Sequence, residues 1–262
     1  VGRQRGIPCR QILPSHISGR LASERAQVPH TLILGGEPIA PALVQQLARL
    51  RSDCRVFNHY GPTEATVGVL VHPLRLDADA ADCGVLSQVL GNNKVFVLDD
   101  NLQLAPVGVL GELYLGGAQL CRGYVNAEAD AQVFIQNPFN PQERLYRTGD
   151  LARYRPDLAI QLHGRRDQQI KVRGFRIELA EIEAELLRLP HVAQALVLPG
   201  ESAQAGLLAF IVAAQTPAAG ALEAIRDELA LRLPSVMLPQ HLQFIDSFPR
   251  LANGKIDRRA LQ

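Results

Sequence analysis

The sequence predicts a larger α/β lobe, with the edge of a parallel sheet and a small β-barrel, followed by a small α+β lobe. Three observations predict it. Strand and helix signals alternate over residues 28–72, short strands separated by turn residues fill 85–165, and a new pattern of helices and strands begins near 168. With 262 residues, of which 47% are hydrophobic, the chain can bury a sizeable core. We place the lobes at residues 1–166 and 167–262.

Residues 28–72 support the prediction of a parallel sheet. The apolar run Thr31-Leu-Ile-Leu34 ends in two glycines and is typical of a buried strand. Pro38 and Pro41 then open a helix with leucines on one face, and Arg55-Val-Phe57 is the next strand. The order strand, helix, strand indicates a parallel sheet edge, with ligands expected at the carboxyl ends of its strands.

Residues 85–165 support the prediction of a β-barrel. The run Lys94-Val-Phe-Val-Leu98 ends in an Asp-Asp-Asn turn, and Glu112-Leu-Tyr-Leu115 ends in two glycines. Short strands separated by Gly, Asp and Pro are typical of an antiparallel unit. We therefore expect a small barrel-like unit over this region.

The small lobe follows a short polar segment, Gly164–Gln168, of the kind expected at a hinge. A helix signal over Glu178–Leu189 stops at Pro190, and Ala221–Leu233 is a second amphipathic helix. Strands are expected at Val192–Leu198, Gly206–Ala213 and His241–Phe248. These elements predict an α+β lobe of about 90 residues.

The composition excludes several classes of function. There are 27 Lys and Arg against 26 Asp and Glu, and a net charge of +1 gives no general attraction to nucleic acid or anionic membranes. No apolar run approaches the ~20 residues needed to span a bilayer, so we expect a cytoplasmic protein. Cys9, Cys54, Cys83 and Cys121 form no CxxC pair, which argues against a zinc site.

The segment Asn58-His59-Tyr60-Gly61-Pro62-Thr63-Glu64 is the first candidate for a functional site. It places an amide, an aromatic ring, a hydroxyl and a carboxylate around a Gly-Pro turn directly after a strand. An amide can bind the edge of a base, a ring can stack on it, and a carboxylate near phosphates can hold Mg²⁺. The alternative is a polar turn in which Thr63 caps the next helix.

Three further segments have both a functional and a structural interpretation. In Tyr146–Asp150 the Asp can accept hydrogen bonds from both hydroxyls of a ribose, or close an Asx turn. Gly164–Glu178 has five basic residues in twelve positions and can bind an anion, or form a charged edge strand. In Leu251–Arg259 an Asn-Gly turn precedes Lys255, which can place a charge on a carboxylate or phosphate, or lie in an exposed terminal loop.

In this order and spacing, the segments resemble the core motifs of the adenylation domains of nonribosomal peptide synthetases. Asn58–Glu64 resembles NxYGPTE, Gly111–Tyr124 resembles GELxxxGxxxARGY, Tyr146–Leu151 resembles YRTGDL, Gly164–Glu183 resembles GRxDxQVKIRGxRIELxEIE, and Leu251–Arg259 resembles NGKxDR. The resemblance covers nearly the whole chain and implies the acyl-adenylate-forming fold.

The resemblance implies two half-reactions. An amino acid reacts with ATP and Mg²⁺ to give aminoacyl-AMP and pyrophosphate, and the aminoacyl group then passes to the phosphopantetheine thiol of a peptidyl carrier protein. The implied partners are the amino-acid substrate, this carrier protein and neighbouring synthetase modules, without nucleic acid or membrane.

The resemblance also implies a role for individual residues. Lys255 would be catalytic, Glu64 would hold Mg²⁺, Asp167 would be the hinge, and Gly174 would lie in the loop at the pantetheine tunnel. ATP would be bound by Asn58, Tyr60, Gly61, Thr63, Asp150 and Arg165. The amino-acid pocket would be lined by Ile12, Ile33, Gly35, His59, Val67 and Gly68.

The chain does not contain the Gly-rich, Lys-containing phosphate loop that precedes these motifs in the family. We therefore expect it to be the C-terminal portion of an adenylation domain, cut inside the larger lobe, that adenylates weakly or not at all when isolated. Two alternatives remain open. One is another acyl-adenylate-forming ligase acting on aryl or fatty acids, and the other is a non-catalytic fragment that docks a carrier protein or module.

Overall fold

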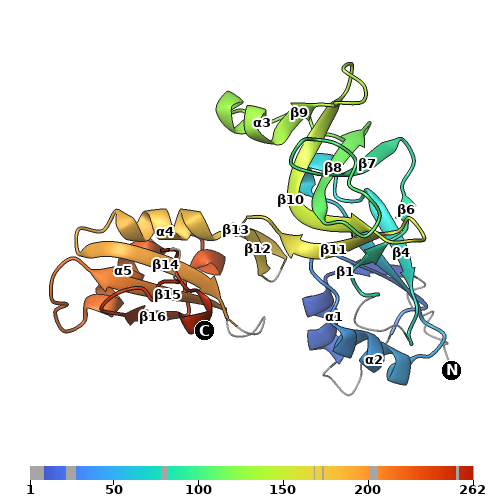
Figure 1. The fold of residues 1–262 in the computed structure, drawn as a ribbon. Helices are drawn as coiled ribbons and strands as arrows, with labels where there is room; N and C mark the ends of the chain where they lie inside the picture. Colours follow the sequence, from blue (N-terminus) through green and yellow to red (C-terminus); the bar gives the residue numbers. More distant parts are fainter. Residues whose placement is uncertain are drawn as a thin grey trace. The chain divides into compact units, whose positions relative to one another are not determined.

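Figure 1 shows the computed structural model of the chain, which describes residues 9–21, 28–77, 82–167, 169–172, 174–200, 206–251 and 254–261. The chain divides into two compact units, Val1–Asp167 and Gln168–Gln262. The first combines an α/β layer with an antiparallel β layer, and the second is a small α+β unit. No helix in the described part of the chain is long and apolar enough to cross a membrane.

The α/β layer of unit 1 is a five-stranded sheet with two helices. Its strands, in spatial order, are β1 (Cys9–Ile12), β2 (Thr31–Gly35), β3 (Arg55–Tyr60), β4 (Leu70–Leu74) and β6 (Gln88–Val89). The first three run parallel, β4 pairs antiparallel with β3, and β6 pairs antiparallel with β4. The predicted parallel edge is thus present, with α1 (Pro14–Leu21) and α2 (Pro41–Leu50) sharing one apolar core with the sheet (Figure 1).

Helix α2 shows how the local sequence produces this layer. Pro41 lies at its start, where the fixed φ of proline suits the first helical turn. Leu43, Val44 and Leu47 are buried against the sheet at helical spacing. Leu50, the last helical residue, is 51% exposed, so the apolar face ends one turn earlier than the pattern of leucines predicts.

The β layer of unit 1 is a curled antiparallel sheet (Figure 1). Its strands, in spatial order, are β5 (Val85–Leu86), β11 (Ile160–Arg165), β10 (Arg144–Tyr154), β8 (Gly111–Gly117) and β7 (Asn93–Leu98), with β9 (Phe134–Gln136) also paired to β10. A short helix, α3 (Ala127–Val133), is capped by Asn126, whose side chain accepts hydrogen bonds from two backbone amides of the first turn. Cys54 and Cys83 are buried, Cys121 is half-buried and Cys9 is exposed, and none of the four forms a disulfide.

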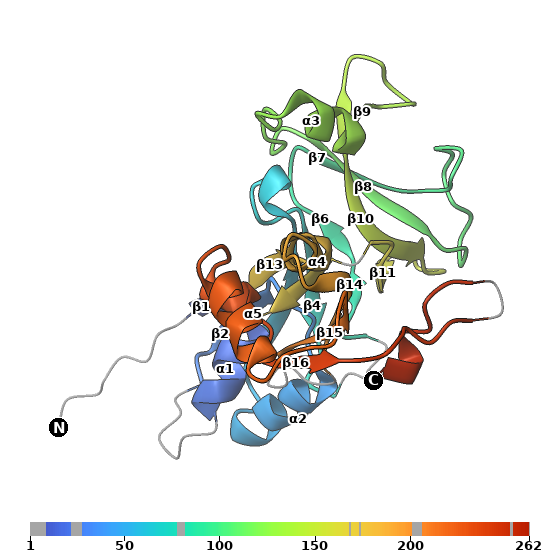
Figure 2. The same ribbon diagram turned by 90° about the vertical axis from the view of Figure 1, so that its left-hand side faces the viewer.

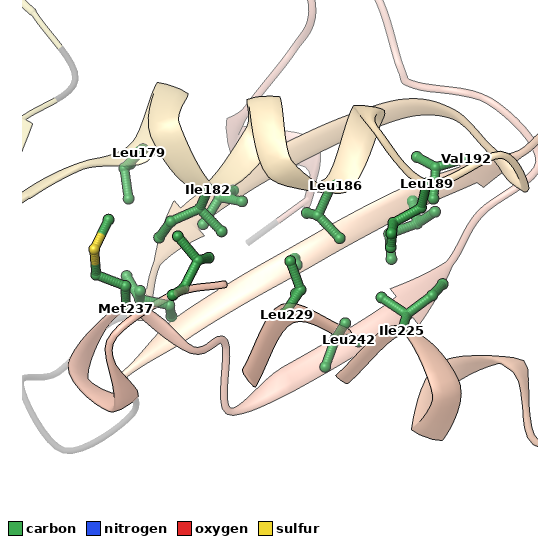
Figure 3. Packing of buried hydrophobic residues seen from close by; sticks show 14 of the residues in the cluster. Leu179, Ile182, Leu186, Leu189, Val192, Ile225, Leu229, Met237 and Leu242 are labelled. Carbon is green, nitrogen blue, oxygen red and sulfur yellow. The ribbon is translucent and has the colours of Figure 1, made fainter. Parts of the chain in front are cut away.

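Unit 2 opens with a hairpin of β12 (Gln169–Val172) and β13 (Phe175–Glu178), which leads into α4 (Leu179–Leu187). Its sheet contains β14 (Val192–Pro199), β15 (Leu207–Ala213) and β16 (His241–Phe244). Helix α5 (Ala221–Ala230) follows β15 and precedes β16 in the sequence. Helices α4 and α5 pack on one face of this sheet (Figure 2). Figure 3 shows the apolar core between them, where α4 and α5 bring leucine and isoleucine side chains together. The C-terminal segment, which contributes Phe248 and Ile256, packs on the other face.

Candidate functional site

A bulge in the long strand β10 is the centre of the candidate site. On one side β10 pairs with β8 at Arg147 with Tyr114 and again at Leu151 with Glu112, so that three residues of β10 oppose one residue of β8. Pairing with β11 is also irregular beyond Asp150. Bulges redirect side chains, and they are frequent next to active sites. The redirected segment is Thr148-Gly149-Asp150, which belongs to the motif that the sequence analysis singled out.

Hydrogen bonds and a glycine stabilise the bulge. The Thr148 hydroxyl donates to the Leu113 carbonyl at 2.8 Å and accepts from the Asp150 backbone amide at 3.0 Å. Gly149 has a φ of +77°, and a Cβ at this position would lie 2.6 Å from the Arg165 guanidinium and from the Asp167 carboxylate. Only glycine therefore allows these two side chains to approach the backbone of the bulge.

The Asp150 carboxylate joins a ring and a guanidinium from two other strands. The Tyr60 hydroxyl, at the end of β3, donates to one carboxylate oxygen, and Arg165 Nη1 donates to the other at 2.7 Å. Arg165 also donates to both oxygens of Asp167 at 2.7 Å and to the Thr148 carbonyl at 2.9 Å. The structure thus brings Tyr60, Asp150, Arg165 and Asp167 into one cluster within unit 1.

Burial and charge shift two pKa values in this cluster. Burial, together with the charge and hydrogen bonding of Asp150, raises the pKa of Tyr60 well above its usual value, so the hydroxyl stays a donor. Burial lowers the pKa of Arg165, but its hydrogen bonding to Asp167 and the charges of Asp150 and Asp167 outweigh this effect and raise its pKa. Arg165 therefore remains a cation between two carboxylates.

Asn58 lies two residues before Tyr60 on β3 and is buried. Its side-chain nitrogen donates to the carbonyls of Cys83 at 3.0 Å and Val85 at 3.2 Å. These bonds use both hydrogens of the amide and join β3 to the start of the β layer. The acceptor that Asn58 can offer to a ligand is therefore its Oδ1.

Glu64 lies in the 3₁₀ turn η1 (Thr63–Ala65) that follows β3, and it is 6% exposed. Tyr124 donates its hydroxyl to Glu64 Oε1, and burial and this hydrogen bond raise the pKa of Tyr124. Tyr124 is a site residue that the sequence analysis did not single out, although it is the last residue of the motif at Gly111–Tyr124. Sequence spacing could not show that it meets a carboxylate sixty positions away.

The described residues contain no group of three or more His, Cys, Asp or Glu side chains that could hold a metal ion by themselves. A single buried carboxylate nevertheless suits Mg²⁺, which usually keeps several waters and is held by one or two carboxylates together with substrate phosphates. Glu64 is a carboxylate of this kind. The residues present therefore fit a magnesium ion that arrives bound to a nucleotide.

Four of the six predicted pocket residues gather on one side of the β2–β3 pair. Gly35 on β2 pairs with His59 on β3, and a Cβ at Gly35 would lie 2.4 Å from the His59 carbonyl. A Cβ at Gly68 would lie 2.0 Å from His59 Nε2, so the ring of His59 lies directly against Gly68. Ile33 is on the same face as Gly35, because residues two apart on a strand share a face. Burial lowers the pKa of His59, which favours the neutral ring.

The structure does not bring Ile12 to this group. Ile12 pairs with Leu34 in parallel register, and both pack against the core on the helix side of the sheet. The neighbouring Gln11 pairs with Ile33 and therefore shares its face. Val67, the remaining predicted pocket residue, lies in the loop after η1 with a φ of +68° and a largely exposed side chain.

Two predicted residues belong to unit 2. Gly174 occupies the turn between β12 and β13 with a φ of +83°. Lys255 is exposed beside Gly254, in a turn closed by backbone hydrogen bonds between Leu251 and Gly254 at 2.9 Å and between Leu251 and Lys255 at 2.8 Å. Asn253 of the same motif lies outside the described residues.

The chain is similar to known families and proteins. The family described as AMP-binding enzyme matches residues 11–125, and its C-terminal domain matches residues 181–255. The chain is 41% identical to tyrocidine synthase 3 of Brevibacillus parabrevis over 232 residues, which is 87% of this chain and 4% of that protein. It is 40% identical to gramicidin S synthase 2 of Aneurinibacillus migulanus over 243 residues, which is 92% of this chain and 5% of that protein. The chain thus spans only a small part of the length of these relatives.

The chain belongs to the family of AMP-binding enzymes. It is a portion of an adenylation domain of the nonribosomal peptide synthetase type. Among solved structures it resembles holo-PA1221, a nonribosomal peptide synthetase protein containing adenylation and PCP domains. The identity is 26%, the TM-score is 0.82, and the match covers 98% of this chain and 45% of that chain. The fold is therefore that of the acyl-adenylate-forming enzymes.

The two family matches divide the site residues of this AMP-binding enzyme. The first contains Asn58, Glu64 and Tyr124, and the second ends at Lys255. Of the cluster around Asp150, Tyr60 lies in the first match, whereas Asp150, Arg165 and Asp167 lie between the two matches, as does the boundary between the units.

Proposed function

We propose that the protein activates an amino acid as aminoacyl-AMP and passes it to the phosphopantetheine thiol of a peptidyl carrier protein, within a synthetase of several modules. The observation that carries the proposal is the cluster at the end of β3, where Tyr60, Asp150 and Arg165 converge beside the bulge. An aromatic ring, a carboxylate and a guanidinium are the groups needed to hold the base, ribose and phosphates of a nucleotide.

The adenosine part of ATP would be held by β3 and the bulge of β10. Asn58 Oδ1 would accept a hydrogen bond from the amino group of adenine, and the ring of Tyr60 would stack on the base. Asp150 would accept hydrogen bonds from the ribose hydroxyls, because each carboxylate oxygen can accept more than one. Arg165, held against Asp150 at 2.7 Å, would assist at the sugar and phosphates.

The triphosphate would lie over the turn after β3. Thr63 is exposed at the start of η1 and would contact the phosphates, and Gly61 allows the tight turn that presents it. Magnesium, when bound, neutralises charge on the phosphate oxygens. Glu64 would hold the ion, and Tyr124 would orient that carboxylate through its hydrogen bond.

In the first half-reaction, a carboxylate oxygen of the amino acid attacks the α-phosphorus of ATP, and pyrophosphate leaves. Lys255 would stabilise the charge that develops between the carboxylate and the α-phosphate. In the second, the thiolate sulfur of the carrier attacks the carbonyl carbon, and AMP leaves. We assign Asp167 as the pivot between the two arrangements and Gly174 to the loop that faces the incoming pantetheine. Two different closed sites formed in turn are a recognised use of a hinge.

Amino-acid-dependent exchange of pyrophosphate into ATP tests the proposal in the intact enzyme. Lys255→Ala should lower the exchange rate by about 10²- to 10³-fold, the usual cost of losing one group that stabilises developing charge. Lys94→Ala is a matched control, since Lys94 lies in unit 1 and pairs with Glu143 on the surface, and its rate should stay within about twofold of wild type.

The outcomes separate the alternatives. Exchange that depends on aryl or fatty acids instead of amino acids would favour a different acyl-adenylate-forming ligase. No exchange with any acid, or a Lys255→Ala rate equal to wild type, would contradict the proposal and favour a docking fragment.

A further inference from the structure

Arg166 connects the last residues of unit 1 to two acidic side chains of the β layer. Its Nη1 donates to Glu112 Oε2 at 3.1 Å, and its Nη2 donates to Asp100. Glu112 on β8 is buried and also accepts two hydrogen bonds from Arg147, at 2.9 and 3.0 Å. The carboxylate of Glu112 is thus held between two guanidinium groups, and we call Asp100, Glu112 and Arg166 the linker anchor.

The linker anchor holds Arg166, which belongs to residues 165–167, the last three residues of unit 1, and each of these residues is bonded to another part of that unit or to its neighbour in the segment. The Arg166 backbone amide donates to the Gly149 carbonyl at 2.8 Å. The residue before it, Arg165, is held by Asp150, and the residue after it, Asp167, is held by Arg165. Unit 2 begins with the next residue. The polar segment that the sequence suggests as a flexible hinge is therefore fixed up to the last residue of unit 1.

Each charged group in the linker anchor is stabilised in its ionised form by a partner of opposite charge. The hydrogen bond from Arg166 lowers the pKa of Asp100, and the same bond raises the pKa of Arg166. Glu112 is nearly removed from water, where an ionised carboxylate is stable only with charged or hydrogen-bonding partners. Arg147 alone already supplies two such bonds. Burial of Glu112 therefore does not require Arg166. The further effect of the bond between them is that the side chain of Arg166 is held in one position.

We propose that Arg166 is a positioning residue that fixes the end of unit 1, so that unit 2 turns only about the backbone that follows it. Each linker residue held in place removes conformational freedom that would otherwise enlarge the set of arrangements open to unit 2. The proposal rests on the proposed function, because it assigns the anchor to the turn between the two half-reactions. Arg166 acts through the position of Asp167 and touches none of the residues proposed to bind ATP other than its neighbour in sequence.

The structural part of the proposal is tested by hydrogen exchange on the chain itself. Arg166→Met keeps an apolar stem but removes both charged hydrogen bonds. The backbone amide at position 166 and the segment around it should then exchange about fivefold faster, the factor that corresponds to loss of an ion pair worth about 1 kcal/mol. Asp100→Asn should give a smaller increase at the same amides, because Glu112 still holds Arg166.

Arg155→Met is the matched control. Arg155 lies in the turn between β10 and β11 and donates to Asp82 at 3.0 Å, so the control removes an arginine–aspartate pair of the same sheet away from the linker. It should leave exchange of the linker amides unchanged. The proposal is wrong if Arg166→Met leaves those amides unchanged, or if protection is lost throughout β8 and β10, since Arg166 would then only stabilise the sheet.

The functional part is tested by both half-reactions in the intact enzyme. When more residues of the linker are loose, unit 2 spends less time in either productive arrangement. Arg166→Met should therefore lower kcat about fivefold for adenylate formation and for carrier loading. The KM for ATP should not change, since the side chain of Arg166 bonds to Glu112 and Asp100 and to none of the groups proposed to bind ATP. An altered KM with unchanged kcat would overturn the proposal. An inactive wild-type enzyme would contradict the proposed function instead, and the hydrogen-exchange result would stand independently.

Discussion

The two units bury different kinds of residue. Among the described residues, seven polar or charged side chains are buried, and six of them lie in unit 1. The core of unit 2 is made almost entirely of Leu, Ile, Val and Met from two helices and a sheet. Its predicted functional residues, Gly174 and Lys255, lie in exposed turns. Unit 1 therefore places recognition groups inside its structure, whereas unit 2 is an apolar scaffold that presents groups on its surface.

The difference has an energetic reason. A buried polar group costs stability unless it has a partner. In unit 1, Asn58 has two carbonyls, Glu64 has Tyr124, and Glu112 has Arg147 and Arg166. These bonds hold the side chains in place before a ligand arrives, which is what a binding site needs. Among the described residues of unit 2 only Gln169 is a buried polar side chain, and it donates to Glu178, so this unit is stabilised mainly by apolar burial.

The largest expected effect is the loss of a core side chain in unit 2. Leu186 on α4 is fully buried, and Leu186→Ala should lower the free energy of unfolding of unit 2 by about 3–4 kcal/mol through lost burial and the remaining cavity. Urea unfolding followed by far-UV circular dichroism should show the shift. Tyrosine fluorescence should not, because all five tyrosines lie in unit 1 and the chain has no tryptophan.

The adjacent leucine provides the control. Leu187 is 50% exposed, and Leu187→Ala should change the unfolding free energy by no more than about 0.5 kcal/mol. Equal shifts of both signals in Leu186→Ala would show that the two units unfold together, and the comparison between them would fail.

The next effect is steric and concerns unit 1. A Cβ at Gly61 would lie 2.2 Å from the Val67 carbonyl oxygen and 3.0 Å from the Val69 amide, both of them backbone atoms. Gly61→Ala should therefore destabilise unit 1 by about 2–3 kcal/mol, seen as an earlier tyrosine fluorescence transition. Gly91→Ala is the control, since a Cβ at Gly91 would meet no atom within 4 Å. If both variants behave like wild type, the turn after β3 is less tightly packed than the structure shows.

A smaller effect is expected at the buried carboxylate. Tyr124→Phe removes the hydroxyl that donates to Glu64 and should cost about 1.5–2 kcal/mol, the lower part of the range for a hydrogen bond to a charged group, because Tyr124 is 39% exposed. Tyr154→Phe, which removes a hydroxyl that accepts from the Val97 amide at 3.1 Å, should cost less because neither partner is charged. Urea unfolding of both variants measures the difference, and a larger cost for Tyr154→Phe would contradict this account of Glu64.

The smallest effect is a dependence on pH. Burial lowers the pKa of His59 in the folded chain. In the unfolded chain histidine has a pKa of about 6.5, so the folded chain binds the imidazole proton of His59 less tightly than the unfolded chain does. The stability that comes from neutral His59 is complete above that pH and is lost as the pH falls below it. Stability of wild type should thus decline more steeply from pH 7 to 5 than that of His59→Gln. Parallel curves for the two proteins would argue against burial of the ring.

Much of this fold follows from local patterns. The alternation of strand and helix predicts β2, α2 and β3, and proline at the start of α2 explains where that helix begins. Helical spacing predicts α4 and α5, although α5 ends at Ala230, before the Leu233 at which the pattern ends. Turn residues mark the short strands of the β layer. The motifs in these patterns also identify the family, and they contain Tyr60, Asp150 and Arg165, which the structure brings together.

The sequence alone thus determined the classes of element, their order, and which residue types could act on a nucleotide. Only the tertiary structure decided which of them meet. The pairing of Glu64 with Tyr124, the anchoring of Arg166 by Glu112 and Asp100, and the presence of Gln11 instead of Ile12 on the face of Ile33 all depend on strand register and on contacts between distant segments. A periodic pattern shows that a side chain lies on one of two faces, but only the packed sheet shows which face and what lies opposite it.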